Sequence, residues 1–374
     1  MSVEIEPPVK KAKTFANEDD YCNKIIDKCI EDIKNSQKNL EPVLSDDFQK
    51  SIPLIKVFVG IIKDPKDLSR TVLMLNEKIP LKELQHLKRI RKKEVILCPT
   101  NFIIGMSSIQ QYIECNVEEL KDTFQYFKEL DVPLSPPKVK QQFKEWNKIW
   151  SCNFHPNVYL EKLVSGNFFA PTELNLHRTY MEIAFEVSRW YILHLNLNTN
   201  EDDVFRNINS AVIVDPTTQS VVAVSFDNRD ANPLQHSSML AIDNVAKTQN
   251  GGVWSTEDIN PDRTLSGISE ELLNYLKPRY PSVRFGARKF ISKCDISSDE
   301  YNGNPSDGPY LCTGYYAYLI REPCVMCSMA LVHARVKRIF FCFDNMFDGA
   351  LKSKSKLHTI SSLNHHFEVF TGFL

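Results

Sequence analysis

Two cysteines near the C-terminus have the spacing of metal ligands. Cys324 and Cys327 follow Pro323, between a predicted buried strand at 315–320 and a predicted helix at 326–335. Proline suits a helix start, and thiols three residues apart on the first turn point the same way. The partial positive charge of a helix N-terminus favours thiolate. The pair can therefore supply half of a tetrahedral zinc site, although a Cys-x-x-Cys can also be redox-active.

His236 is the candidate for the other half of this site. It lies at the start of a second predicted helix, 235–246. A histidine followed downstream by Pro-Cys-x-x-Cys resembles the deaminase signature H-x-E…P-C-x-x-C, in which zinc activates water and the glutamate moves protons. Ser238 occupies the glutamate position, and a serine hydroxyl cannot hold and return a proton near neutral pH. We therefore predict His236, Cys324 and Cys327 as zinc ligands, with no catalytic residue.

The motifs together resemble the non-catalytic subunits of the eukaryotic heterodimeric tRNA adenosine deaminases. The resemblance covers the last half of the chain well, whereas the first half is weaker. It rests on Tyr310–Tyr315, Arg321–Cys327, Met329–His333, Gly349–Leu351 and Leu363–His365, with His86–Arg89 and Trp150–His155 as the best pieces of the first half.

This resemblance implies a fold and a function. The fold would be a cytidine-deaminase-like mixed α/β sheet between helices, preceded by a small ferredoxin-like α/β domain that helps to bind tRNA. The chain would bind Zn²⁺ and tRNA and would pair with a catalytic subunit that retains the H-x-E glutamate. That pair would convert adenosine to inosine at the wobble position of tRNA anticodons, and we expect it in the nucleus and cytoplasm.

Other polar residues near the motifs are weaker candidates. Asp243 lies two helical turns from His236, about 11 Å along the axis, too far to share a substrate proton. Glu322 corresponds to a family position that is not the proton shuttle. His333 lies on a different part of its helix from the cysteines, and Cys312 is predicted to be a buried thiol.

Composition sets broad limits. With 374 residues, 43% of them hydrophobic, the chain can form one large or two ordinary domains with a sizeable core. The net charge of −2 means that any RNA binding must come from local basic patches. Ten irregularly spaced cysteines after a polar N-terminus fit an intracellular chain better than a disulfide framework.

The chain divides into three predicted parts. Residues 1–20 form a disordered tail, residues 21–165 an N-terminal α/β domain, and residues 166–374 a deaminase-like domain with a long insertion at about 250–308. Within the N-terminal domain, the apolar spacing at 117–130 predicts an amphipathic helix.

The densest basic stretch is a candidate RNA-binding site. Its cations are Lys88, Arg89, Arg91, Lys92 and Lys93. A solvated surface connection is the simpler interpretation of such a run. If the stretch contacts the tRNA backbone, neutralising Lys88, Arg89 and Arg91 together should weaken binding and flatten its salt dependence.

Three hypotheses stay open from the sequence. The apolar C-terminal residues, 370–374, could fold over the degenerate metal site and block it. The chain could instead be a self-sufficient cytidine or nucleotide deaminase with another proton shuttle, which activity on free nucleosides would reveal. It could also be a structural zinc and RNA-binding protein without an enzyme partner.

Overall fold

The computed structural model describes residues 18–48, 51, 53–103, 105–195, 208–249, 251–254, 267–288 and 309–374. The chain forms two compact units: Leu44–Phe168 is one, and Phe169–Leu374 together with the residues up to Val43 is the other. The predicted N-terminal tail and its lysines up to residue 17 lie outside the described residues. Among the described helices, none has both the length and the apolar character to cross a membrane.

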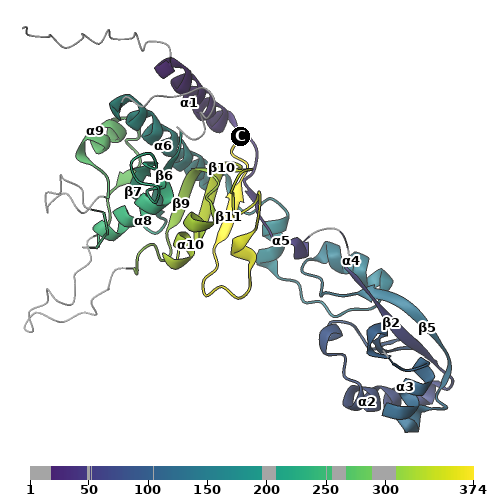
Figure 1. The fold of residues 1–374 in the computed structure, drawn as a ribbon. Coiled ribbons are helices and arrows are strands. Elements are labelled where there is room, and N and C mark those ends of the chain that lie inside the picture. Colours follow the sequence, from purple (N-terminus) through teal and green to yellow (C-terminus); the bar gives the residue numbers. More distant parts are fainter. Residues whose placement is uncertain are drawn as a thin grey trace, which may run out of the picture. The chain divides into compact units, whose positions relative to one another are not determined.

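The unit of Leu44–Phe168 is a four-stranded antiparallel sheet with the order β3-β4-β2-β5. Its main elements are β2 (Leu54–Ile62), α2 (Leu68–Lys78), β3 (Ile90–Arg91), β4 (Glu94–Pro99), α3 (Ile109–Asn116), β5 (Phe124–Pro133), α4 (Lys140–Ile149) and α5 (Val158–Val164). The paired strands β2 and β5 lie side by side in Figure 1. The sequence β-α-β-β-α-β with this strand order is the ferredoxin-like arrangement, as expected. Helices α2 and α3 pack on one face, and Trp146 and Trp150 of the α4 region pack on the other.

The helix predicted at 117–130 is wrong, because the second half of this segment belongs to β5, which pairs along the full length of β2. A β-bulge shifts the register where Ile61 pairs with Tyr126 and Ile62 with Phe124. The extra residue places Phe124 and Phe127 on the same face, with ring centroids 5.4 Å apart. A bulged strand therefore reproduced the three-residue apolar spacing of a helix.

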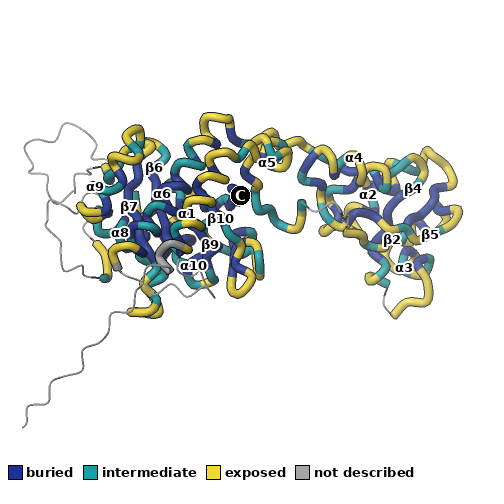
Figure 2. Tube along the Cα trace, turned by 90° about the horizontal axis from the view of Figure 1, so that it is seen from above, coloured by how far each residue is buried: buried dark blue, intermediate teal, exposed yellow. Residues whose placement is uncertain are grey.

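The second unit is a seven-stranded mixed sheet with the order β1-β11-β10-β9-β6-β7-β8. Its elements are α1 (Glu18–Asn35), β1 (Glu41–Pro42), α6 (Pro171–Leu195), β6 (Ser210–Asp215), β7 (Ser220–Phe226), α8 (Ser237–Lys247), α9 (Glu270–Arg279), β8 (Arg284–Phe285), β9 (Tyr316–Arg321), α10 (Val325–His333), β10 (Arg338–Phe343) and β11 (Glu368–Thr371). Alternate residues of β9 separate the two faces: Ala317 and Leu319 pack towards α8 and α10, whereas Tyr318 meets α6. The result is a three-layer sandwich of the cytidine deaminase fold, with its strands buried (Figure 2).

Residues 21–43, which the sequence placed in the N-terminal domain, belong instead to this second unit. Helix α1 packs along α6, with Arg189 of α6 ion-paired to Asp27 at 2.6 Å. Strand β1 pairs antiparallel with β11. A segment far away in sequence thus completes one edge of the sheet, and local pattern gives no sign of that pairing.

The insertion is described only in part, at 251–254 and 267–288. This segment contains the helix α9, and β8 adds a parallel strand next to β7. Arg288 of this segment forms an ion pair with the buried Asp215 at 2.7 Å. That cation is therefore part of the fold.

An aromatic cluster holds α6 against strands β9 and β10 of the sheet. His177 of α6 lies 2.7 Å from the Tyr318 hydroxyl and stacks on Phe340 with centroids 4.4 Å apart. Burial lowers the pKa of His177 to about 3, with Arg338 adding to the effect. The folded protein therefore keeps this imidazole neutral.

We predict a pH-dependent loss of stability from His177. Its folded pKa of about 3 lies below the value of about 6.5 in an unfolded chain, so only the unfolded chain takes up the proton between these values. The free energy of unfolding should fall by about 1.4 kcal/mol per pH unit below about pH 6.5 from this group alone. His177→Gln should remove that slope in denaturation measured from pH 7 to pH 4.5, whereas the exposed His333→Gln should keep it. An unchanged slope in His177→Gln would contradict the assignment.

Candidate metal centre

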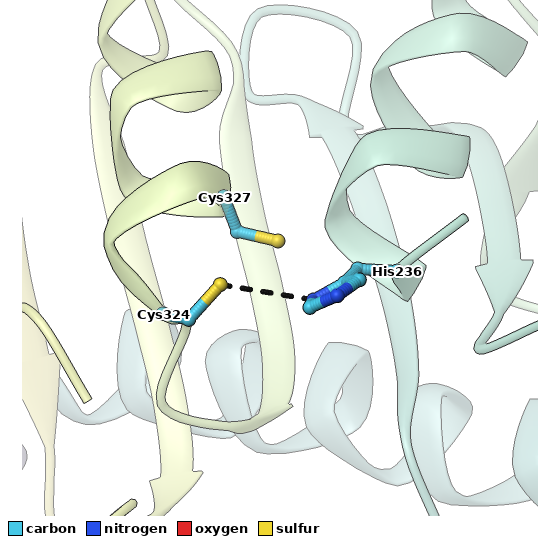
Figure 3. A group of neighbouring side chains, drawn as sticks. All are labelled: His236, Cys324 and Cys327. Atoms are coloured by element: carbon cyan, nitrogen blue, oxygen red, sulfur yellow. Dashed lines mark hydrogen bonds between the residues drawn. The ribbon is translucent and has the colours of Figure 1, made fainter. Parts of the chain in front are cut away.

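The predicted ligands lie at the N-termini of two helices. His236 is the N-cap of α8 and Cys324 the N-cap of α10, while Cys327 lies in the first turn of α10 (Figure 3). Neither N-cap side chain accepts a hydrogen bond from its own helix. Both side chains point towards each other instead. Each helix therefore lacks the hydrogen bond of a side-chain cap, and its N-cap residue is part of this cluster.

The topology of the sheet explains why the two helices meet. Chains leaving the ends of β7 and β9 lead into α8 and α10. Strand β6 lies between these strands and runs antiparallel to both, so its start lies at the same edge. Asn209, just before β6, lines the cavity between the two helix starts.

The three side chains form one group with the geometry of a metal site. One ligand atom from each of His236, Cys324 and Cys327 lies within 4.8 Å of the others. Nδ1 of His236 is 3.7 Å from Sγ of Cys324. A tetrahedral centre with Zn–S and Zn–N bonds of about 2.3 and 2.0 Å would hold these atoms about 3.5 Å apart. The donor set and its spacing therefore fit zinc.

The electrostatics of the cluster favour a thiolate. A hydrogen bond from the Cys327 thiol, together with the nearby His236, lowers the pKa of Cys324 to about 5. The same thiolate and burial raise the pKa of Cys327, while a hydrogen bond with Ser238 acts in the opposite direction. The serine at the glutamate position thus contacts a predicted ligand.

The cavity at this group is too small for a nucleobase. Its volume is about 30 Å³, enough for about one or two water molecules. Polar side chains fill the rest of the site: Arg229 pairs with Asp227 at 2.7 Å, and Arg321 donates to Asn345 at 3.1 Å. Glu322 and Asp348 also line the cavity, and both carboxylates accept hydrogen bonds from the loop after β10.

Glu322 organises that loop. Its buried carboxylate accepts hydrogen bonds from the backbone N–H groups of Asn345, Leu351, Lys352 and Ser353, at 2.5–3.0 Å, and from the Ser353 hydroxyl. Gly349 passes so close that an added Cβ would lie 2.3 Å from a carboxylate oxygen. The residue next to the Pro-Cys-x-x-Cys motif therefore fixes the loop 344–353 over the cavity.

Other residues considered from the sequence lie elsewhere or have structural partners. Asp243 accepts a hydrogen bond from the Val253 N–H at 2.6 Å and pairs with Lys247. The hypothesis of a C-terminal plug is wrong: Phe370 belongs to β11 and Phe373 is buried, and no described residue beyond Asp348 lines the cavity. Cys312 is fully buried, as predicted.

The basic stretch divides into buried and exposed cations. Arg89 is 8% exposed, and its guanidinium donates to four protein groups. Arg91 pairs with Glu94 at 2.7 Å and lies over the Trp150 ring. Lys88, Lys92 and Lys93 are exposed. Arg89 is therefore not the exposed cation that the sequence suggested, and Arg91 is engaged within the domain.

Sequence reasoning missed the polar residues that close the cavity. These are Asn209, Arg229, Arg321, Asn345 and Asp348. Polar side chains where buried strands end, such as Arg321 after β9 and Asn345 after β10, were the available signal.

Comparisons with known proteins identify the family. The family described as "tRNA-specific adenosine deaminase TAD3 N-terminal domain" matches residues 55–150, and the "Cytidine and deoxycytidylate deaminase zinc-binding region" matches residues 205–343. The chain is 31% identical over 350 residues to "Probable inactive tRNA-specific adenosine deaminase-like protein 3" of Danio rerio, covering 89% of this chain and 91% of that protein. This chain belongs to the TAD3 family.

Two further relatives have similar coverage. The Homo sapiens protein with the same name is 31% identical, with 89% of each chain covered. The "tRNA-specific adenosine deaminase subunit TAD3" of Saccharomyces cerevisiae is 27% identical, with 94% of this chain and 91% of that protein covered. The TAD3 match thus includes both the ferredoxin-like unit and the metal group.

We predict that Glu322 controls the rigidity of the loop 344–353. Glu322→Gln would place amide hydrogens against backbone N–H donors, so the amides of Leu351 and Lys352 should exchange with deuterium at least about tenfold faster. Asp344→Asn, which removes an exposed ion pair with Lys352 in the same loop, is the matched control and should have little effect. Equal exchange in the two variants would contradict this role.

Proposed function

We propose that this chain is the catalytically silent, zinc-binding subunit of a heterodimeric tRNA wobble-adenosine deaminase. The observation that carries the proposal is the group of His236, Cys324 and Cys327 with Ser238 at the glutamate position, in a chain of the TAD3 family. Hydrolysis of the adenosine amino group to give inosine would take place on a related subunit that retains the H-x-E glutamate.

His236, Cys324 and Cys327 would hold the zinc ion, with Ser238 hydrogen-bonded to Cys327. In a complete deaminase site, bound zinc supplies the Lewis acidity that activates water. Here the protein residues hold two helix starts together, because His236 belongs to α8 and both cysteines to α10. A structural use of the metal is consistent with this arrangement.

Two features argue that the site itself does not react. No group at position 238 can carry a proton near neutral pH, and the carboxylates of Glu322 and Asp348 are committed to the loop after β10. The cavity of about 30 Å³ also leaves no room for an extruded base. Both a proton carrier and space for substrate would have to be restored for activity.

A rigid apolar pair next to the cavity supports a protein partner. Met346 and Phe347 are 70% and 86% exposed, although such side chains are usually buried. Asn345, fixed by Glu322, accepts the Phe347 N–H at 3.3 Å. An exposed aromatic residue on a fixed loop is typical of a protein interface. We assign this loop to the contact with the catalytic subunit.

The ferredoxin-like unit would contribute tRNA binding. Lys88, Lys92 and Lys93 are its exposed cations in the basic stretch, and such contacts to phosphates are salt-dependent. With tRNA as substrate, we propose that the subunit works in the nucleus and cytoplasm.

Inosine formation on a transcribed tRNA with a wobble adenosine tests the proposed function. The lone chain should contain zinc and produce no inosine, and co-expression with a glutamate-bearing deaminase subunit should give inosine. Ser238→Glu in the lone chain should also remain inactive, because the cavity stays closed. Inosine from the unaltered lone chain would instead support a self-sufficient deaminase, and zinc without any deaminase partner would support a structural protein.

The interface assignment gives a separate prediction. Phe347→Asp should weaken the complex with the catalytic subunit by about tenfold or more, because a charge would have to be desolvated in the interface. Zinc content should not change. Leu73→Asp, a similarly exposed apolar position in the other unit, is the control for surface charge. Sedimentation of the mixed subunits measures both, and unaltered assembly of Phe347→Asp would exclude this surface.

A further inference from the structure

A groove in the ferredoxin-like unit has a floor that carries an uncompensated positive charge. The groove has a volume of about 710 Å³ and lies between the end of α2 and the segment that leads into β3. Its polar lining consists of Asn76, Gln85, Lys88, Arg89 and Asn153. These residues lie outside the metal centre and have no part in it.

Arg89 is the buried cation of this groove. Its guanidinium donates to Asn76 Oδ1 at 2.9 Å and to the carbonyl oxygens of Ile79, Ile96 and Leu97 at 2.8–3.1 Å. All four acceptors are neutral, and no carboxylate of the described chain forms an ion pair with it. A buried charge without a counter-charge is costly. An anion in the groove would therefore interact favourably with Arg89.

The walls of the groove present hydrogen-bond donors. Asn76 accepts from Arg89 through Oδ1, which leaves its amide N–H groups as donors. Gln85, Lys88 and Asn153 are exposed. One N–H of the five on Arg89 also remains without a partner among the described residues. A wall rich in donors, without a lining carboxylate in the described groove, suits phosphate oxygens.

A second pocket adjoins the groove and offers aromatic surface. It has a volume of about 310 Å³ and shares Pro80, Leu81 and Leu84 with the groove. Phe102, which is 50% exposed, and Tyr112 line it. Lys78, Lys82 and Glu83 also line this pocket, so two cations face one carboxylate. Proteins commonly bind unstacked bases on aromatic faces that lie next to lysines.

We propose that the groove and the pocket together bind one unpaired segment of RNA, with a phosphate over Arg89 and Lys88 and the neighbouring base against Phe102. The inference rests on the proposed function in that it takes tRNA as the source of this segment. Charge complementarity favours RNA over an apolar peptide. The aromatic pocket favours an unpaired nucleotide over a duplex, whose bases are stacked and paired.

The test compares binding of two labelled RNAs to the assembled complex by fluorescence anisotropy. One is a single-stranded oligoribonucleotide of mixed sequence, and the other is a duplex of the same length. The single strand should bind more tightly. Phe102→Ala should weaken its binding by about tenfold, the usual effect of losing one stacked base. Lys88→Ala should weaken binding of the single strand. It should also lower the slope of log K against log salt concentration by about 0.7 in magnitude, as expected for the loss of one phosphate contact on a single strand.

Matched controls separate the groove from general surface effects. Tyr126→Ala removes an aromatic side chain of similar exposure on β5, and Lys144→Ala removes an exposed lysine of α4. Both should bind RNA like the parent complex. Equal binding of single strand and duplex, equal losses in Phe102→Ala and Tyr126→Ala, or stronger competition by an acidic peptide than by RNA would overturn the inference.

Inosine formation by the same samples distinguishes this inference from the proposed function. If the parent complex forms inosine and Phe102→Ala binds single-stranded RNA normally, the groove assignment fails and the proposed function stands. If the parent complex forms no inosine, the proposed function fails whatever the groove binds.

Discussion

The structure depends on the convergence of two helix N-termini at one edge of a mixed sheet. Strand β6 runs antiparallel between β7 and β9, so α8 and α10 start at the same edge and direct their partial positive charges into one space. Two such ends would repel each other without a negative group between them. The Cys324 thiolate, with its pKa lowered to about 5, supplies that charge, and a metal ion held by His236 and both cysteines would tie the helices together.

The loop next to the metal group is also ordered by interactions that do not require catalysis. Glu322 lies next to the Pro-Cys-x-x-Cys motif, and its carboxylate fixes the loop that presents Met346 and Phe347. A site that retains its metal ligands but has Ser238 in place of the proton shuttle can therefore still hold the starts of α8 and α10 together. Under the proposed function, the metal centre and the loop would together form the surface that contacts the partner subunit.

Motif spacing was enough to single out three candidate ligands, because these residues lie at predicted helix starts, whereas the deaminase-like sheet and the ferredoxin-like unit were expected from the family resemblance. Long-range pairing was not predictable in this way. The pairing of β1 with β11 joins Glu41 to Thr371, and the bulge opposite Ile61 made β5 resemble a helix. Arg89 shows the same limit at a single residue, because composition cannot distinguish a solvated cation from one that donates to three backbone carbonyls.

The most direct test of whether this site is catalytically silent replaces Ser238, the residue at the position of the catalytic glutamate. Inosine formation should be measured for three complexes: the parent pair, the pair with Ser238→Ala, and the pair whose catalytic subunit has lost its H-x-E glutamate. We expect the pair with Ser238→Ala to form inosine within about twofold of the parent rate, and loss of the glutamate in the partner to abolish inosine formation. Inosine that persists without the partner's glutamate and disappears in Ser238→Ala would show that this chain performs the chemistry.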